Sequence, residues 1–208
     1  MTARKAQTAQ RVEVCILAGG KSSRMGVDKS RLRLGRRTML GHIGASANAA
    51  GFRSRVIRAD LVPRCGPLAG VYSALATSRA EAILFLSCDM PFISTKLLRA
   101  LSGRLGPRTK ALFVAERGRV GFPFLLRHSA LPVVEGQLAR RQFSLQGLAR
   151  VLRAQTVSLP PDQANELFNI NTPEDWEMAR ARWRQSKQIP KSKHPAPEKP
   201  QGPSFKQL

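Results

Sequence analysis

Small and basic residues are concentrated in one stretch near the start of the chain, directly after an apolar run at residues 12–17. Residues 17–29 read LAGGKSSRMGVDK, with three glycines, two serines and three cations. Glycine lets the backbone turn sharply and lets a ligand approach closely, because it has no Cβ atom. The exposed N–H groups of such a turn, together with the cations, form an anion site that suits a polyphosphate. This stretch is therefore predicted to bind the phosphates of a nucleotide.

Two other phosphate-binding motifs are excluded by the same residues. The letters GGKS at residues 19–22 resemble the end of a P-loop, but that motif requires glycine at position 15, where the chain has Cys15. The dinucleotide motif GxGxxG is also absent. The remaining alternative is a flexible surface loop with solvated charges. It is disfavoured because such a loop need not follow an apolar strand directly or space its cations in this way.

Asp89 is the candidate metal ligand. It lies two residues after the apolar run at residues 82–87 and two residues before Pro91. A carboxylate fixed at the end of a buried strand and facing a triphosphate would hold Mg²⁺ together with water molecules. The surrounding cations would keep this carboxylate ionised. The alternative is that Asp89 caps the turn after it.

Two cations further along the glycine-rich stretch are candidate catalytic residues. Lys29 and Arg24 lie too far from the tight turn to form part of it, so they can reach over the phosphates. There they would offset the negative charge that develops during phosphoryl or nucleotidyl transfer. Lys21 is expected to be a solvated neighbour. Asp28 is expected to pair with loop amides or with Arg24, with a metal-ligand role as its alternative.

The body of the chain alternates between strand and helix patterns. Strands are expected at residues 12–17, 53–59, 82–87, 110–115 and 122–126, with a short extended piece at 167–171. Helices are expected at residues 38–50, 67–77, 94–103, within 129–153, and from 172 to about Trp183. This alternation predicts an α/β fold: a three-layer α/β/α sandwich with a mainly parallel sheet.

The carboxyl ends of the strands are the expected position of the ligand. In open α/β sheets, ligands bind beyond these ends. The turns that contain glycine or aspartate after the first three strands would all open at this one edge. Gly19, Lys29, Asp60 and Asp89 are therefore predicted to meet at one crevice.

The charge of the chain is its most unusual bulk property. The 208 residues have a formal net charge of +22. We expect a disordered N-terminus at residues 1–11, one domain at 12–184, and a disordered basic tail rich in proline and lysine at 185–208. The tail holds only a minor share of the charge, so the domain itself would attract anions: nucleotides, phosphorylated small molecules or nucleic acid. Nucleic acid is disfavoured, because aromatic residues make up only 6% and no zinc-finger or RNP-like pattern occurs.

The cysteines and the termini predict the compartment. Three cysteines far apart, without a CxxC motif, support neither a disulfide framework nor a zinc ribbon. Residues 1–11 lack the apolar core of a secretory signal, and no apolar run is long enough to span a membrane. The expectation is a soluble cytoplasmic protein with no membrane partner.

Four motifs in order give the chain a family resemblance. They are LAGGxSxRMGxDK at residues 17–29, GPLAG at 66–70, CDMP at 88–91 and NINTPED at 169–175. Together they resemble the molybdenum cofactor guanylyltransferase family, within the nucleotide-diphospho-sugar transferase-like fold. The resemblance implies a Rossmann-like nucleotidyltransferase fold, and it covers most of residues 12–183.

The resemblance also implies a reaction and a set of site residues. GTP and molybdenum-bound molybdopterin would give the guanine dinucleotide cofactor and pyrophosphate, with Mg²⁺ as the metal. The residues that contact the nucleotide would be Leu17, Ala18, Gly19, Gly20 and Asp60. Lys29 would contact its phosphates, and Asp89 would hold the metal. Asn169 and Asn171 would face the pterin phosphate. Related cytidylyltransferases tend to have alanine where this chain has Gly20, which favours GTP over CTP. A CTP-using relative, or one with another phosphorylated acceptor, is the alternative.

Partners beyond the substrates follow from the same resemblance. A molybdoenzyme or its chaperone would receive the product. Two features depart from the family pattern. The segment from Gly51 to Gly66 is too short for the extra strand, and for the loop with an Asn, that the family usually has before the position of Asp60. The basic tail also lies outside the pattern.

Overall fold

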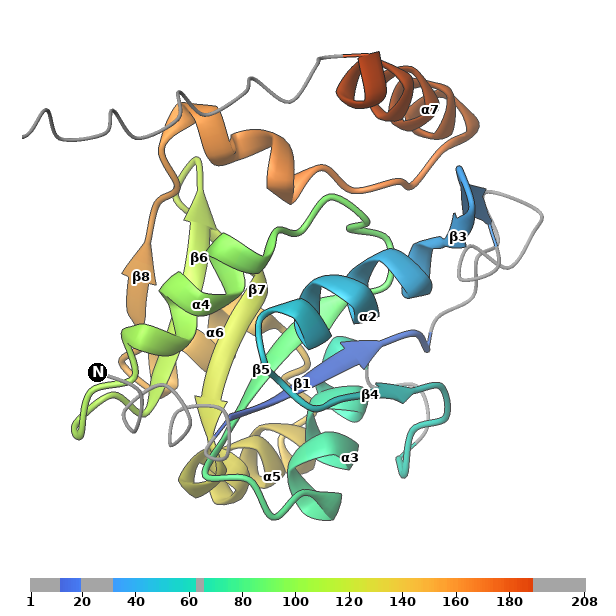
Figure 1. Cartoon of the computed structure of the whole chain (residues 1–208). Helices are drawn as coiled ribbons and strands as arrows, with labels where there is room; N and C mark the ends of the chain where they lie inside the picture. Colours follow the sequence, from blue (N-terminus) through green and yellow to red (C-terminus); the bar gives the residue numbers. More distant parts are fainter. Residues whose placement is uncertain (1–11, 20–31, 63–65, 189–208) are drawn as a thin grey trace, which may run out of the picture.

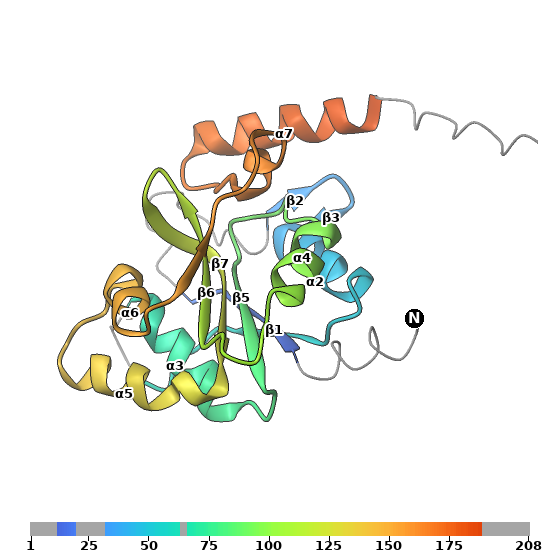
Figure 2. The same ribbon diagram turned by 90° about the vertical axis from the view of Figure 1, so that its left-hand side faces the viewer.

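The protein is built around a six-stranded sheet covered by helices on both faces (Figures 1 and 2). This computed structural model describes residues 12–19, 32–62 and 66–188. In the order in which they pair, the strands are β4 (Ser54–Ile57), β1 (Val12–Leu17), β5 (Ala82–Ser87), β7 (Arg119–Arg127), β6 (Ala111–Glu116) and β8 (Gln155–Val157). The helices are α2 (Met39–Ala49), α3 (Pro67–Thr77), α4 (Thr95–Gly103), α5 (Leu131–Ala139), α6 (Leu145–Val151) and α7 (Pro173–Gln188). None of the helices in these residues is long and apolar enough to cross a membrane.

The sheet is mainly parallel, as predicted. Strand β1 pairs in parallel with β4 and β5, and β6 pairs in parallel with β8. Strand β7 runs the other way, because it is antiparallel to both β5 and β6. The carboxyl ends of β1, β4, β5 and β6 therefore lie at the same edge of the sheet.

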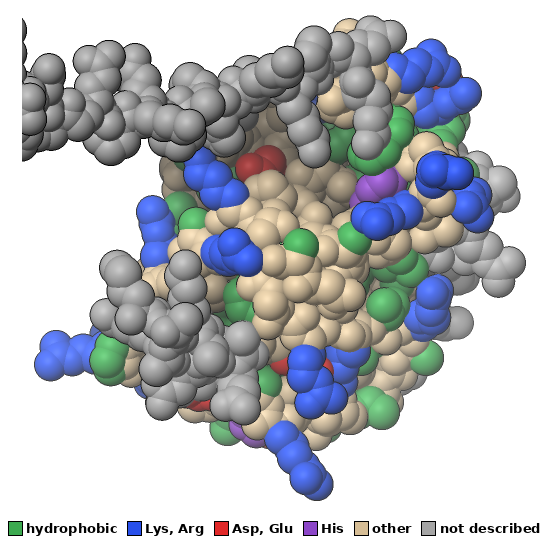
Figure 3. Space-filling view, in the orientation of Figure 1, with side chains coloured by type: hydrophobic (Ala, Val, Ile, Leu, Met, Phe, Trp, Pro, Cys, Tyr) green, Lys and Arg blue, Asp and Glu red, His purple; other side chains and the backbone are tan. Residues whose placement is uncertain are grey.

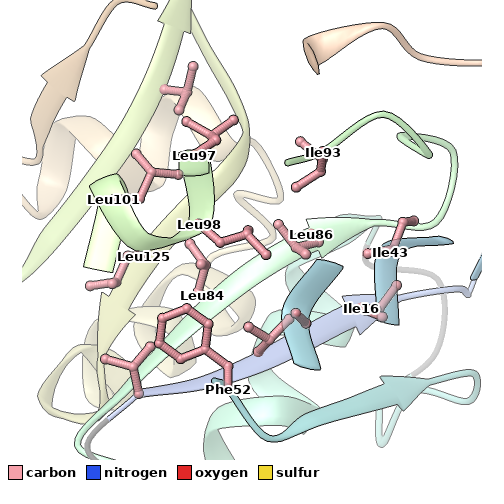
Figure 4. Packing of buried hydrophobic residues seen from close by; sticks show 14 of the residues in the cluster. Ile16, Ile43, Phe52, Leu84, Leu86, Ile93, Leu97, Leu98, Leu101 and Leu125 are labelled. Atoms are coloured by element: carbon pink, nitrogen blue, oxygen red, sulfur yellow. The ribbon is translucent and has the colours of Figure 1, made fainter. Parts of the chain in front are cut away.

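Alternate residues of the central strands pack into opposite layers. In β1, Val14 and Ile16 pack in the layer of α2 and α4, whereas Cys15 and Leu17 pack in the layer of α3. The unbroken apolar run of β5 divides in the same way between the two layers. Figure 4 shows Leu98 of α4 directed toward the strands. The result is the predicted three-layer α/β/α sandwich, with both faces of the sheet buried.

Cys15 is part of this packing and not of a reactive site. It is fully buried in β1. Burial raises the pKa of its thiol to about 12. The thiol therefore stays protonated at neutral pH and behaves as a small apolar group.

Side chains cap the starts of helices α2, α4 and α7. The Thr38 hydroxyl accepts a hydrogen bond from the Gly41 N–H at 3.0 Å, and the Ser94 hydroxyl accepts one from Leu97 at 3.0 Å. At α7, the Asp175 N–H donates to the Thr172 hydroxyl at 3.1 Å. The Asp175 carboxylate in turn accepts from the Thr172 N–H at 2.9 Å. These reciprocal bonds fix the first turn of α7.

Several elements differ from the sequence-based predictions. Residues 161–167 form a 3₁₀ helix, η3 (Pro161–Leu167), so the extended piece expected at 167–171 is wrong at its start, and residues 168–171 have no regular secondary structure. Helix α7 continues past Trp183 to Gln188, into the first residues of the expected tail. The short strands β2 (Arg33–Leu34), β3 (Arg37–Thr38) and β8 were not predicted. The rest of the tail, residues 189–208, and the N-terminus, residues 1–11, lie outside the described residues.

Helix α7 lies across the β2–β3 hairpin and covers a small apolar cluster of its own. Buried side chains of this cluster come from the hairpin, from α2, from the segment before α7 and from α7 itself: Leu34, Met39, Ile170 and Ala179. The Trp183 ring packs edge-on against His42, with ring centroids 4.6 Å apart. A Cβ atom at Gly35, where φ is +64°, would lie 2.5 Å from the Trp183 Nε1 atom. Only glycine fits at this turn of the hairpin.

Candidate functional site

Gly19 and Asp60 meet at the carboxyl edge of the sheet, as predicted. A Cβ atom placed on Gly19 would lie 3.7 Å from the Asp60 Oδ1 atom. Both residues line a cavity of about 280 Å³, together with residues from the ends of β1, β4 and β5 and the start of α3. The lining residues are Leu17, Gly19, Ile57, Asp60, Gly66, Pro67, Gly70, Ser87 and Phe122. We refer to this space as the nucleotide cavity, after the ligand that the sequence predicts for it.

Backbone hydrogen bonds fix the floor of the nucleotide cavity beyond the end of β1. The Ala18 N–H donates to the Ile57 carbonyl at 2.8 Å, which extends the pairing with β4. On the other side, the Cys88 N–H donates to the Leu17 carbonyl at 3.1 Å. Residues Leu17–Gly19 are thus held between the two neighbouring strands, which gives a rigid support for a ligand.

Asp60 is positioned by helix α3. The Ser73 hydroxyl accepts a hydrogen bond from the Leu61 N–H at 2.8 Å and donates to the Ala69 carbonyl at 2.8 Å. This bridge ties the loop after β4 to α3. Partial desolvation raises the pKa of the Asp60 carboxyl above its ordinary value. The side chain is nevertheless exposed at the rim of the cavity, so solvent screens much of this effect.

Gly70 lets α3 approach two residues of the nucleotide cavity, Leu17 and Asp60. A Cβ atom at this position would lie 3.1 Å from a Leu17 methyl group and 3.3 Å from Asp60 Oδ1. A larger residue would therefore push into the cavity wall. The GPLAG motif identified this segment in the sequence, but the sequence did not indicate which contact requires its second glycine.

Asp89 comes shortly after the strand β5, whose last residue, Ser87, lines the nucleotide cavity. Its backbone carbonyl accepts a hydrogen bond from the Ile170 N–H at 3.0 Å, which joins the CDMP and NINTPED motifs. Its Oδ1 atom is buried and has no hydrogen-bond partner in the described part of the chain. Such an orphaned acceptor is costly unless a cation satisfies it. The residue therefore fits a metal ligand better than a turn cap.

A metal ion at Asp89 would need further ligands from beyond the described residues, such as substrate oxygens and water. The described residues contain no cluster of three or more His, Cys, Asp or Glu side chains that could surround an ion. Mg²⁺ is commonly bound by one or two carboxylates, with phosphate oxygens and water as the other ligands. The single carboxylate of Asp89 matches this type of site.

The two asparagines of the NINTPED motif lie apart from the nucleotide cavity. Asn169 lines a second cavity of about 390 Å³, which we call the hairpin cavity. The Asn171 N–H donates to the Asp175 carboxylate at 2.8 Å, so its backbone belongs to the cap of α7. Phe122 lines both cavities, which makes them neighbours. Sequence reasoning missed Phe122, because nothing in its local pattern indicates a cavity wall.

The basic residues of the glycine-rich stretch fall in a part of the chain that the structure does not describe. Gly20, Arg24 and Lys29, along with Lys21 and Asp28, lie outside the described residues. Their roles at the phosphates remain predictions. Figure 3 shows many Lys and Arg side chains and few acidic ones on the face it displays.

A larger cavity of about 540 Å³ lies at the opposite, amino edge of the sheet and includes none of the predicted site residues. The Arg55 guanidinium fills a structural role there. It forms an ion pair with Glu13 at 3.1 Å and donates hydrogen bonds to the Thr77 hydroxyl at 2.7 Å and the Ala74 carbonyl at 2.5 Å. These bonds satisfy polar groups in the last turn of α3, so the role of Arg55 is structural. Cavity size alone therefore does not identify the functional site.

An open α/β sheet with a cavity at its carboxyl edge, a glycine turn after the first strand and a carboxylate after each neighbouring strand defines a nucleotide-binding protein of the Rossmann-like class. The chain belongs to the family of proteins with a MobA-like NTP transferase domain, whose family model matches residues 14–159.

Individual relatives agree with this assignment. The chain is 30% identical over 188 residues to a probable molybdenum cofactor guanylyltransferase of Carboxydothermus hydrogenoformans, covering 81% of this chain and 94% of the relative. It is 32% identical to the molybdenum cofactor guanylyltransferase of Xanthomonas euvesicatoria, covering 77% and 90%. The fold is similar to the crystal structure of molybdopterin-guanine dinucleotide biosynthesis protein A from Archaeoglobus fulgidus, with a TM-score of 0.68 and 20% identity, covering 83% and 99%.

Proposed function

We propose that this protein transfers GMP from GTP to molybdenum-bound molybdopterin, which forms the guanine dinucleotide cofactor and releases pyrophosphate. The observation that carries the proposal is the nucleotide cavity, where Gly19 and Asp60 meet. The strand β5 beside this cavity leads to Asp89, whose Oδ1 atom has no hydrogen-bond partner among the described residues. Membership of the MobA-like family and the names of the curated relatives support the same reaction.

The nucleotide is held by the rigid backbone after β1 and by the Asp60 carboxylate. Gly19 offers no Cβ atom, so a flat base or ribose can approach the backbone closely. Asp60 accepts hydrogen bonds from the nucleoside. These contacts orient the triphosphate toward the end of β5, and orientation alone contributes much of the rate in transfer reactions.

Transfer exchanges one phosphorus–oxygen bond for another. A phosphate oxygen of the acceptor forms a bond to the α-phosphorus of GTP, while the bond from that phosphorus to its bridging oxygen breaks. The electron pair of the broken bond leaves with pyrophosphate. Asp89 would hold Mg²⁺, which neutralises charge on the triphosphate and on the leaving group. Lys29 and Arg24 offset charge at the same phosphates, as positioned cations do.

One experiment tests the proposed reaction directly. The purified protein is incubated with molybdenum-bound molybdopterin, Mg²⁺ and each of the four nucleoside triphosphates in turn, and the dinucleotide product is identified by mass spectrometry. The expected result is a guanine dinucleotide with GTP and little product with the other three. A cytosine dinucleotide as the main product would replace the proposal by its CTP-dependent alternative.

Two further expectations remain part of the proposal. The reaction belongs in the cytoplasm, where thiols such as Cys88 stay reduced. The product is expected to pass to a molybdoenzyme or to its chaperone. Retention of the guanine dinucleotide on the protein until an acidic acceptor protein is added would support this handover.

A further inference from the structure

The hairpin between β6 and β7 presents arginines at the functional edge of the sheet. Arg117 and Gly118 form its two-residue turn, with φ angles of +50° and +75°. Positive φ at both turn residues is typical of a type I′ hairpin, where Gly, Asn and Asp are preferred. Arginine is unusual at this position, because its Cβ atom is crowded in the left-handed conformation.

The hairpin lies beside the nucleotide cavity. Strand β6 runs parallel to β1 and β5 in the sheet, so its last residue, Glu116, is at the same edge as Gly19. The hairpin cavity is lined on one side by residues 114–122 and on the other by Leu167 and Asn169. Phe122 lines both cavities, so a ligand in either cavity would contact this side chain.

The charge of the hairpin cavity is positive. Arg117, Arg119 and Glu116 all line it. Within the part of the chain that the structure describes, neither arginine forms an ion pair or a side-chain hydrogen bond, although Glu116 lies directly opposite Arg119 in the register. Both guanidinium groups are exposed and available to an anion. Guanidinium groups bind phosphate with two parallel hydrogen bonds.

Helix α6 holds this hairpin in place. The Gln146 side chain donates to the Val120 carbonyl at 2.7 Å and accepts from the Val120 N–H at 3.3 Å. A register shift between Phe113 and Val114 bends the strand just below this point. The backbone that carries the two arginines is therefore held in position by α6, as a binding site requires.

We infer that the hairpin cavity binds the phosphomonoester end of the acceptor, with Arg117 and Arg119 as its phosphate ligands. The inference rests on the proposed function, and it adds two cationic ligands for the second substrate to the asparagines that the family resemblance implies. The acceptor phosphate would lie where the two cavities adjoin beside Phe122, so that its oxygen can reach the α-phosphorus of the nucleotide. Asn169 lines the same cavity and provides a neutral polar group beside the two cations.

The test uses two variants that are chosen to be compatible with the fold. Arg117→Gly removes one guanidinium and places at φ +50° the residue that prefers this conformation, so the variant is expected to fold. Arg119→Gln keeps most of the side-chain volume on the strand. Arg79→Gln is the matched control, an exposed arginine at the amino edge of the sheet. Steady-state kinetics give separate KM values for GTP and acceptor, and fluorescence titration gives the affinity for molybdopterin without nucleotide.

The expected result is a selective loss on the acceptor side. Each hairpin variant should weaken molybdopterin binding and raise its KM about ten- to a hundredfold, while the affinity for GTP stays within about twofold of the unaltered protein. Arg79→Gln should change neither. Unchanged acceptor affinity in both hairpin variants, or an equal loss of GTP affinity, would overturn the inference. If another nucleotide replaces GTP but the variants still lose molybdopterin, the proposed function fails and the acceptor site stands.

Discussion

At the level of single residues, Asp89 separates catalysis from stability most cleanly. Its Oδ1 atom makes no hydrogen bond in the described structure, so replacing this oxygen removes no internal partner. Asp89→Asn should lower the Mg²⁺-dependent transfer rate about 10²- to 10³-fold, with an unchanged melting temperature in metal-free buffer. The check is a kinetic assay paired with a thermal melt. A large drop in melting temperature would show that Asp89 acts as a turn cap.

Gly70 offers a test of the cavity wall. The added methyl of Gly70→Ala would press on Leu17 and Asp60 from 3.1 and 3.3 Å, and the expected result is roughly tenfold weaker GTP binding. Gly44→Ala is the control, because Gly44 also lies in a helix but has nothing within 4 Å of the added atom. It should leave GTP binding intact and stabilise the protein by up to about 1 kcal/mol. Calorimetry of both variants distinguishes crowding from helix propensity, and equal GTP affinities would contradict the assignment of the wall.

Asp60 predicts a dependence of stability on pH. Its pKa in the folded protein lies above the ordinary value of 3.8, so the folded state holds this proton to a higher pH than the unfolded chain does. Ionisation of Asp60 therefore lowers the free energy of unfolding as the pH rises through this range, and the penalty is absent below both pKa values. Asp60→Asn should raise the melting temperature at pH 7 and lose this advantage in acid. Melting curves without nucleotide from pH 3 to 7 test the sign, and a lower melting temperature of the variant at pH 7 would refute it.

Among the site residues, the sequence was most informative where a strand ends. Gly19, Asp60 and Asp89 each come shortly after a strand of the sheet, and topology alone brings such positions to one edge. Phe122 and the arginines of the hairpin could not be found in this way. Their role depends on β7 running antiparallel next to β5, which is a property of the assembled sheet.

At the level of elements, the docking of α7 on the β2–β3 hairpin can be tested with two glycines. Gly35 and Gly51 both have positive φ, but only Gly35 has Trp183 within contact of an added Cβ atom. Gly51→Ala should cost about 1 kcal/mol of stability from the left-handed conformation alone. Gly35→Ala should cost roughly 1–3 kcal/mol more, because the methyl displaces the indole ring. Denaturant unfolding measures both, and equal losses would mean that α7 does not press on this turn.

The elements that sequence patterns predicted share strong local signals. The apolar run of β5 and the capping residues Thr38 and Ser94 fixed their elements closely. The missed strands β2, β3 and β8 are two or three residues long, too short for an alternation to show. The end of α7 was misjudged because the sequence after Trp183 is polar and resembles the tail that follows it. The helix continues to Gln188 because no glycine or proline stops it before Pro190.

For the whole molecule, the excess of positive charge governs how substrates arrive. Lysine and arginine outnumber aspartate and glutamate by 35 to 13, and the ion pairs among described residues are few: Glu13–Arg55, Glu81–Arg127 and Glu177–Arg180. Most cations therefore face solvent and act together as a long-range field for polyanions. This field does not determine which polyanion reacts, because that selection depends on the shape and the polar groups of the cavities.

Ionic strength should expose this field. Both proposed substrates are anions, so kcat/KM for each is expected to fall about three- to tenfold between roughly 50 and 300 mM monovalent salt. The value of kcat at saturating substrates should change much less, because bound groups are screened less than distant ones. Initial rates at fixed Mg²⁺ give both quantities. A kcat/KM that is independent of salt would show that the surplus charge serves another purpose.

Phe122 gives the two compartments a common wall, and a shared wall makes their occupants interdependent. We expect the substrate that binds first to set the position of the Phe122 ring, so that the second substrate binds against a wall whose position is already fixed. Synergy between the substrates, seen as a preferred sequence of addition in the kinetics, is the natural outcome of such an arrangement.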